Sequence, residues 1–253
     1  LRAANPRLIV CSVTGFGQTG PYAHRAGYDF IIQGLGGIMS LTGEPDGAPQ
    51  KSGVAIADLF TGVYSAVAIL AALHERASTG AGRHIDMALL DVQVACLANQ
   101  AMNQMIGGMT PRRLGNAHPN IVPYQVFPAS DGHLIIACGN DRQFAALCQA
   151  LDLGDLAADP AFATNPARVG NRATLCARIA AATAARTRAD ILSVLERAGV
   201  PAGPINTVGD ALAEPQIVSR RLKIELDGRD LGRLGVRDRL VVLEHPPEGA
   251  GQL

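Results

Sequence analysis

One carboxylate in this chain combines a helix start with an apolar setting, and it is the first candidate for chemistry. Asp58 lies in the segment VAIADLFTG (residues 54–62), at the beginning of an apolar stretch that predicts a helix over residues 55–76. A carboxylate in such a setting is costly unless it caps the helix or reacts. The spacing by itself favours an acid at the N-cap or in the first turn, where the helix dipole stabilises negative charge.

The same physics allows a second interpretation, in which Asp58 is a covalent nucleophile. A helix N-terminus keeps the carboxylate ionised, and apolar neighbours remove its water and make it more reactive. A carboxylate nucleophile suits acyl transfer between a thioester and an acid, because this exchange is nearly isoenergetic and needs no water. The residues alone leave both interpretations open.

A glycine-rich segment follows the first predicted strand. Residues 15–20 read GFGQTG and fit the G-x-G-x-x-G pattern of dinucleotide-binding folds. That fingerprint needs its third glycine in the first turn of a helix, whereas Gly20 precedes PYAHRAG, which has no helical pattern. The nearest acidic residue downstream, Glu44, lies in a predicted loop. The motif therefore gives little support to a nicotinamide or flavin oxidoreductase, and a glycine loop beside a ligand phosphate remains open.

Other kinds of site receive no support from the composition. The six histidines do not pair at ligand spacing, so no metal site is expected. The five cysteines form no C-x-x-C pair and are interpreted as free, mostly buried thiols of a reducing cytoplasm. A formal net charge of zero gives no support for nucleic-acid or membrane-surface partners. No apolar run is expected to span a bilayer and no signal peptide is recognised, so a cytoplasmic protein is expected.

The first part of the chain reads as an α/β arrangement. Residues 8–14 (LIVCSVT) predict a strand buried on both faces, as in parallel sheets, and residues 84–88 predict a short second strand. The helix over residues 55–76 has almost no polar face in its middle and is expected to be largely buried. Two further helices are expected at residues 28–39 and 89–106.

The composition changes over residues 107–120, where glycine, proline and charge indicate a linker. Beyond it, the pattern predicts paired strands at residues 122–127 and 133–138 and then helices at residues 141–151, 168–185 and 188–198. The expected organisation is a large domain over residues 1–110, a linker at 111–121, a small α+β domain at 122–207 and a segment at 208–253 that returns towards the large domain and ends frayed.

Four segments in succession resemble the class III (CaiB/BaiF) CoA-transferases. They read SVTGFGQTGPYAHRAGYDFIIQGLGGIMSLTG, SGVAIADLFTGVYSAVAILAALHERASTGAGRHIDMALLD, RLGNAHPNIVPYQVFPASDGHLIIACGNDRQFAALCQALDL and RAGVPAGPINTVGDALAEPQI. Within that family, VPYQ (residues 122–125) and GNDRQF (residues 139–144) are most similar to the succinyl-CoA:glutarate (hydroxymethylglutarate) CoA-transferases. The resemblance implies an α/β fold, with a Rossmann-like large domain that is incomplete in this chain and a small α+β domain, in an interlocked homodimer.

The resemblance also implies a mechanism in which the nucleophilic aspartate of the family falls on Asp58. Its carboxylate would attack an acyl-CoA thioester, succinyl-CoA in the subgroup named above, to give a mixed anhydride and free CoA thiolate. The thiolate would return to form an aspartyl-CoA thioester, and an acceptor such as glutarate would repeat the sequence in reverse. Coenzyme A is then part of the substrate, and no permanently bound cofactor is implied.

Further site residues are carried over from the same motifs. The CoA contacts of the family fall on Arg25, Ala26, Gly27, Tyr28 and Asp29. Arg25 could pair with a CoA phosphate, with a solvated surface arginine as the alternative interpretation. The loop that covers the acyl group falls on Gly115, Asn116 and His118, for which an ordinary linker between domains is the alternative.

The chain also departs from the family. The family has a sizeable segment before the position of Leu1, so an N-terminally truncated chain is expected, and the usual family ending is not recognisable after Leu222. Two other functions remain as alternatives. An α-methylacyl-CoA racemase would place a histidine base where this chain has Tyr28. A truncated, non-catalytic remnant would keep the fold without the activity.

Overall fold

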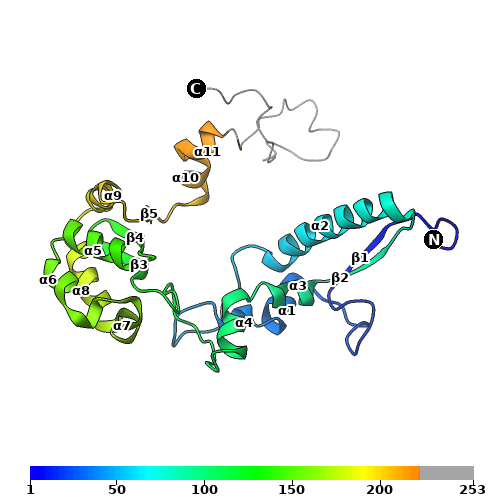
Figure 1. Ribbon diagram of the computed structural model, residues 1–253, viewed down its shortest axis with the longest axis horizontal. Coiled ribbons are helices and arrows are strands. Elements are labelled where there is room, and N and C mark those ends of the chain that lie inside the picture. Colours follow the sequence, from blue (N-terminus) through cyan, green and yellow to red (C-terminus); the bar gives the residue numbers. More distant parts are fainter. Residues whose placement is uncertain (221, 223–253) are drawn as a thin grey trace. The chain divides into compact units, whose positions relative to one another are not determined.

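The computed structural model describes residues 1–220 and residue 222, and the described chain divides between Pro119 and Asn120 into a first and a second unit (Figure 1). The fold is mixed α/β. Most of the predicted return segment at 208–253 lies outside the described residues. In chain order, the first unit contains β1 (Val10–Thr14), α1 (Asp29–Leu35), the 3-10 turn η1 (Ile38–Ser40), α2 (Ile56–Thr79), β2 (His84–Ala88), α3 (Leu89–Ala95) and α4 (Ala98–Met105).

The two strands of the first unit pair in parallel, in a register that runs from Val10 opposite His84 to Thr14 opposite Ala88. Parallel neighbours need a crossover connection, and α2 supplies it by running back along both strands (Figure 1). The prediction of a strand buried on both faces is wrong for the described residues. Val13 on β1 is 53% exposed, because α2 covers one side of a ladder that has two strands in the described chain.

Helix α2 turns small side chains towards its own unit. Its buried residues are Ala57, Thr61, Ser65 and Ala72. The large apolar side chains point outwards instead, and the exposed set consists of Leu59, Phe60, Val63, Tyr64, Val67, Leu70 and Leu73. The expectation that this helix is largely buried is therefore wrong for the described chain. Small inward side chains allow the helix axis to approach the strands closely, whereas an outer face of this kind is typical of a surface that meets another partner.

The length of α2 also corrects one expectation from the sequence. With 24 residues and a mean hydropathy of 1.9 in its most apolar window, α2 is long and apolar enough to cross a membrane by those two measures. Its position as the crossover between β1 and β2 identifies it as a helix of the α/β fold, because a membrane-spanning helix would separate the two strands. The helix ends at Gly80, whose φ of 73° is left-handed and whose amide bonds to the Arg76 carbonyl.

Two predicted helices of the first unit are interrupted. The helix expected over residues 28–39 ends at Leu35, because Gly37 adopts a φ of 88° and the chain continues as η1. The helix expected over residues 89–106 divides into α3 and α4 because Ala98 has a φ of 46°, and one left-handed residue stops a right-handed helix. Neither break could be read from an apolar pattern alone.

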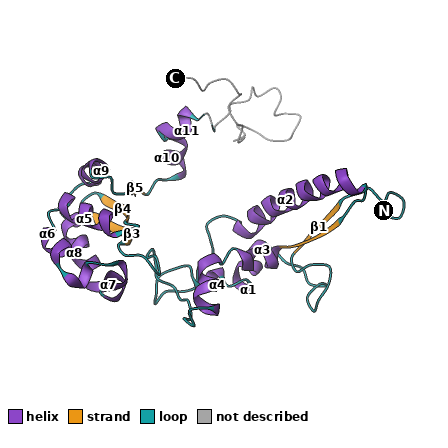
Figure 2. Cartoon of the chain, viewed as in Figure 1, coloured by secondary structure: helices purple, strands orange, loops and turns teal. Residues whose placement is uncertain are grey.

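The second unit contains an antiparallel sheet in the order β3 (Tyr124–Ala129), β4 (Gly132–Ala137) and β5 (Ala202–Pro204) (Figure 2). The predicted hairpin is confirmed, and β5 lies within a segment that the sequence marked only as a break. The remaining elements are α5 (Asp141–Ala150), α6 (Gly154–Ala158), the 3-10 turn η2 (Pro160–Phe162), α7 (Asn165–Gly170), α8 (Arg172–Ala184), α9 (Arg188–Arg197), α10 (Val208–Ala213) and α11 (Pro215–Ser219).

The helices predicted at 141–151 and 188–198 are confirmed to within one residue at each end. The helix predicted at 168–185 is in fact two, α7 and α8. Asn171 separates them, and its side-chain amide donates to the Ala161 and Ala167 carbonyl groups. An asparagine that satisfies nearby backbone carbonyls in this way competes with helix continuation.

A continuous apolar core holds the second unit together. Eighteen buried residues from the sheet and the surrounding helices form it, including Phe127, Leu134, Leu147, Leu175, Ile179, Ile191 and Leu195. One cation is buried beside it. The Arg168 guanidinium donates to the Val122 and Phe162 carbonyl groups and to Asp141 Oδ1, at 2.7, 3.0 and 2.7 Å, and stacks 4.6 Å from the Phe144 ring. All three hydrogen bonds lie within the second unit, so Arg168 ties its entry segment to its helices.

Candidate active site

Asp58 occupies the third position of α2, in its first turn. The N-cap position belongs to Ala55, so the interpretation of Asp58 as an N-cap is wrong and that of a first-turn acid is confirmed. Asp58 is exposed in the described chain. The dry apolar surround that the sequence predicted is therefore not formed by the described residues, and the favourable field of the helix N-terminus remains as the local influence on this carboxylate.

The start of α2 lies at the carboxyl ends of the parallel strands. The other end of α2 is tied to the beginning of β1, because the Arg76 guanidinium donates to the Arg7 carbonyl at 3.2 Å. Helix α2 therefore runs antiparallel to β1 and β2, and Asp58 belongs to the end where both strands stop. In open α/β sheets, ligands bind outside the carboxyl ends of the strands.

A small apolar cluster joins the segments that meet at this end. Ile32 of α1, Ala57 of α2 and Leu89 of α3 are its buried members, with Phe16 and Leu90 packed against them. The cluster places the start of α2 beside the glycine-rich loop and beside α1, although both of these precede α2 by many residues in the sequence. Because Ala57 directly precedes Asp58, this packing sets where the candidate nucleophile lies.

The glycine-rich loop closes on itself at its base. A side chain at Gly15 would meet the Gly27 backbone at 2.6 Å, so the two glycines allow a contact that no other residue type fits. The Asp86 carboxylate of β2 accepts from the backbone amide of Gln18, at 2.9 and 3.1 Å to its two oxygens. That carboxylate takes an amide that a dinucleotide fingerprint would offer to a pyrophosphate, and residues 15–27 contain no helix in the described structure.

The five predicted CoA contacts divide into two groups. Arg25, Ala26 and Tyr28 are exposed, and Tyr28 is 74% exposed. The Arg25 guanidinium carbon lies 3.9 Å from the centroid of the Tyr22 ring, a cation–π geometry that holds the cation at the surface of the loop. These three side chains remain available to a ligand.

Gly27 and Asp29 have contacts inside the chain. Gly27 packs against Gly15 at the base of the loop. The Asp29 Oδ1 atom accepts from the Ala57 amide at 2.8 Å, so this carboxylate caps α2 one residue before Asp58. The structure thus brings the predicted CoA-binding segment next to the candidate nucleophile through Asp29.

The residues predicted to cover the acyl group, Gly115, Asn116 and His118, lie on a loop that is hydrogen-bonded to the segment before α2. The Gly115 amide donates to the Gly43 carbonyl at 3.1 Å, and Gly115 has a φ of 58°. The Arg113 guanidinium donates to the Glu44, Pro45 and Gly47 carbonyl groups at 3.1, 3.4 and 2.8 Å. Asn116 is exposed and His118 is half-buried. These bonds hold the loop to residues 43–47, which lead towards α2.

Sequence reasoning missed two residues that organise this region, Gln33 and Arg113. Gln33 is fully buried and donates to Asp29 Oδ2 at 2.7 Å while it accepts from the Ser52 amide at 2.8 Å. A signal for Gln33 was present, because a glutamine within the apolar run FIIQGL lies four residues after Asp29, the spacing at which helical side chains meet. Arg113 gave no such signal, since its acceptors are backbone carbonyls about 70 residues earlier in the chain.

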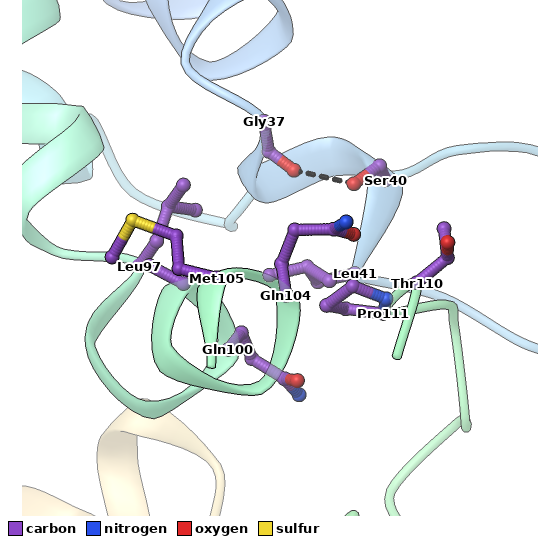
Figure 3. A pocket seen from close by; sticks show the side chains of 10 residues that line it. Gly37, Ser40, Leu41, Leu97, Gln100, Gln104, Met105, Thr110 and Pro111 are labelled. Atoms are coloured by element: carbon purple, nitrogen blue, oxygen red, sulfur yellow. Dashed lines mark hydrogen bonds between the residues drawn. The ribbon is translucent and has the colours of Figure 1, made fainter. Parts of the chain in front are cut away.

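A pocket of about 320 Å³ lies elsewhere in the first unit (Figure 3). Its walls come from η1, α4 and the segment that follows α4, and are formed by Gly37, Ser40, Leu41, Leu97, Gln100, Ala101, Gln104, Met105, Thr110 and Pro111. The Ser40 hydroxyl donates to the Gly37 carbonyl at 2.7 Å on one wall. None of the predicted site residues lines this pocket, so it is separate from the candidate active site.

Two of the five thiols are poorly suited to act as a competing nucleophile. All five cysteines are free, and Cys138, Cys148 and Cys176 are buried as expected, whereas Cys11 and Cys96 are half-buried. Burial raises the pKa of Cys138 to about 12 and that of Cys148 to about 11, so both thiols stay protonated near neutral pH. Among the described residues, no group of three potential ligands is arranged to hold a metal ion.

Comparison with known proteins settles the family. The family model for CoA-transferase family III matches residues 1–248. The chain belongs to CoA-transferase family III. The resemblance of the four sequence segments is thereby confirmed, and Asp58 lies within the matched region.

Two curated relatives and one solved structure show how similar the CoA-transferase family III chain is to known proteins. It is 53% identical over 247 residues to the succinate–glutarate CoA-transferase of Agrobacterium fabrum, covering 97% of this chain and 62% of that protein. It is 42% identical over 231 residues to the human succinyl-CoA:glutarate CoA-transferase, covering 91% of this chain and 53% of that protein. A crystal structure of a CAIB/BAIF family protein from Brucella suis matches with a TM-score of 0.76 and 55% identity, over 97% of this chain and 66% of that one.

The family III chain therefore spans about half to three-fifths of the length of these curated relatives.

Proposed function

We propose that this chain is the nucleophile-bearing part of an enzyme that transfers CoA from succinyl-CoA to a carboxylic acid, with a dicarboxylate such as glutarate as acceptor. The observation that carries the proposal is the position of Asp58, in the first turn of α2 at the carboxyl ends of two parallel strands. The 53% identity to a succinate–glutarate CoA-transferase supports the choice of substrates.

In the proposed reaction, Asp58 carries CoA between the two acids. Its carboxylate attacks the thioester carbonyl of succinyl-CoA, which forms a mixed anhydride and releases CoA thiolate. The thiolate then attacks the aspartyl carbonyl of the anhydride, which releases succinate and leaves an aspartyl-CoA thioester. Glutarate attacks that thioester, and the returning thiolate forms glutaryl-CoA and regenerates the Asp58 carboxylate. Atoms balance without water, and the helix N-terminus stabilises the carboxylate at the start and end of the cycle.

The CoA moiety is proposed to lie along the exposed segment before α1. Arg25 presents a cation that Tyr22 holds in place, and an arginine in this position can form charge-assisted bonds with a CoA phosphate. Ala26 and Tyr28 continue the same surface towards the start of α2. The loop with Gly115, Asn116 and His118 is proposed to cover the acyl group.

The exposed outer face of α2 is proposed to be covered in the assembled enzyme. A carboxylate nucleophile is more reactive when water is excluded, yet Asp58 is exposed in the described chain. The relatives contain a further part, since this chain spans 62% and 53% of their lengths. We propose a homodimer in which the first unit belongs to a Rossmann-like large domain, residues 122–207 form the small domain, and the remaining part and a second copy cover α2.

An acyl-exchange assay on the natural full-length polypeptide tests the proposal. Succinyl-CoA and glutarate should yield glutaryl-CoA with ping-pong kinetics, and Asp58→Asn should abolish this exchange because an amide cannot form the anhydride. The exposed Asp91→Asn is a matched control on α3 and should retain activity. Turnover in Asp58→Asn would contradict the assignment, and exchange of the α-proton of a 2-methylacyl-CoA without CoA transfer would favour a racemase instead.

A further inference from the structure

Helix α2 has no cap of its own. The residue at its N-cap position, Ala55, has no side-chain acceptor, although the first four amides of a helix need partners from outside the helix. Asp29 supplies a partner from 28 residues earlier, since its Oδ1 atom accepts from the Ala57 amide at 2.8 Å. The start of α2 is therefore fixed by a different segment of the chain.

Gln33 in turn holds the Asp29 carboxylate. Its side chain is 0% exposed, and its Nε2 atom donates to Asp29 Oδ2 at 2.7 Å. Its Oε1 atom accepts from the Ser52 amide at 2.8 Å, in the loop that leads into α2. The amide is thus bonded at both ends, and loss of either bond would leave a buried polar group without a partner.

We propose that Asp29 and Gln33 are positioning residues for Asp58, which together form a clamp at the start of α2; this inference rests on the proposed function. Three hydrogen bonds connect α1, the loop at Ser52 and Ala57, and Asp58 is the next residue along the chain. Attack on a thioester carbon requires the reacting atoms to approach within about 3–3.5 Å, and a displacement of about 1 Å can cost about 100-fold in rate. The clamp sets that distance without contacting the substrate.

This role differs from the CoA contact that the family resemblance implies for Asp29. Both of its carboxylate oxygens accept hydrogen bonds from within the chain. A residue used in this way affects the rate of acyl transfer through Asp58, whereas a residue that binds CoA affects the affinity for CoA. The two roles therefore predict different kinetic signatures.

Reversal of the polarity of the clamp provides the test. Gln33→Glu alone places two carboxylates against each other, and Asp29→Asn alone places two amide groups against each other. In the double variant, the introduced asparagine accepts from the Ala57 amide and donates to the introduced glutamate, which accepts from the Ser52 amide. All three hydrogen bonds are restored, with the negative charge moved from position 29 to position 33.

The experiment measures acyl exchange and amide hydrogen exchange in the natural full-length polypeptide. Each single variant should lower kcat about 100-fold with KM for succinyl-CoA unchanged, and the double variant should recover most of the loss. Exchange at the Ala57 amide should be accelerated in the single variants and protected again in the double variant. The exposed Gln149→Glu on α5 is the matched control and should behave like the parent.

Full activity in the single variants, failure of the double variant to recover, or a raised KM with unchanged kcat would overturn the inference. The failure of the proposed function has a different signature, because the parent protein itself would then lack acyl exchange. In that case the Ala57 amide still decides whether the clamp fixes α2. Equal protection in the parent and the single variants would overturn the clamp itself.

Discussion

The two units of this chain bury their apolar residues in very different ways. The second unit encloses eighteen of them in one cluster around a three-stranded sheet, whereas the corresponding cluster of the first unit has three buried members. Twenty large apolar side chains are exposed in the first unit, against six in the described part of the second. The described part of the second unit thus forms a core from its own residues, while the first unit leaves large apolar side chains exposed in the described chain.

Separation of the two units should give the largest difference in unfolding behaviour and self-association. A fragment of residues 120–207 should unfold cooperatively and remain monomeric, because its core is formed entirely from its own residues. A fragment of residues 1–119 should self-associate and bind a hydrophobic dye through the outer face of α2. Thermal unfolding and sedimentation of the two fragments measure this, and a cooperative, monomeric fragment 1–119 would remove the contrast between the units.

A matched pair of leucine substitutions sharpens the comparison within the intact chain. Leu175 is 0% exposed and Leu70 is 65% exposed, and Leu→Ala removes the same atoms at both sites. Leu175→Ala should lower the free energy of unfolding by about 2–5 kcal/mol through loss of burial and a residual cavity. Leu70→Ala should change it by less than about 0.5 kcal/mol, as is usual for a solvated side chain.

Denaturant titration of this chain measures both changes. A cost for Leu70→Ala close to that of Leu175→Ala would contradict the exposure of α2 that the comparison depends on.

The smallest expected effect concerns pH and the surface of the second unit. The Arg188 backbone amide and, to a lesser extent, its guanidinium hold the pKa of Asp131 below its ordinary value. A carboxyl whose pKa is lower in the folded state stabilises the fold above its unfolded pKa, near 3.9, and loses that contribution as the pH falls through the folded value. Melting temperatures of the fragment of residues 120–207 should therefore fall less steeply below pH 4 in Asp131→Asn than in the parent. Parallel curves would contradict this contribution.

Local patterns in the sequence predicted most elements of the fold. The helix over residues 55–76 followed from its apolar run and the glycines after it, and the hairpin at residues 124–137 followed from alternating strands around Asp131-Gly132. The breaks at Ala98 and Asn171 could not be predicted, because they depend on backbone geometry and on bonds to carbonyls outside the local pattern. The burial of α2 was mispredicted because an apolar outer face looks the same in sequence whether its partner is present or not.

The chemistry of the candidate site could be predicted from the sequence, but the hydrogen bonds that position it could not. Asp58 could be singled out from its residue type and its place at a helix start, and the family resemblance gave it a role. The clamp of Asp29 and Gln33 joins segments 19 to 28 residues apart through an amide and a carboxylate, and only the folded chain shows these contacts. Similarly, the Gly15–Gly27 contact is a property of the closed loop and not of the glycine pattern.

The most direct measurement of the central claim is peptide mapping of the natural full-length polypeptide after incubation with succinyl-CoA. Cleavage after Lys51 and Arg76 releases residues 52–76, in which Asp58 and Glu75 are the two carboxylate side chains. The account predicts a CoA thioester on Asp58 that disappears when glutarate is added and is absent from Asp58→Asn. A protein that turns over succinyl-CoA and glutarate without any adduct on this peptide, or with the adduct on another residue, would contradict it.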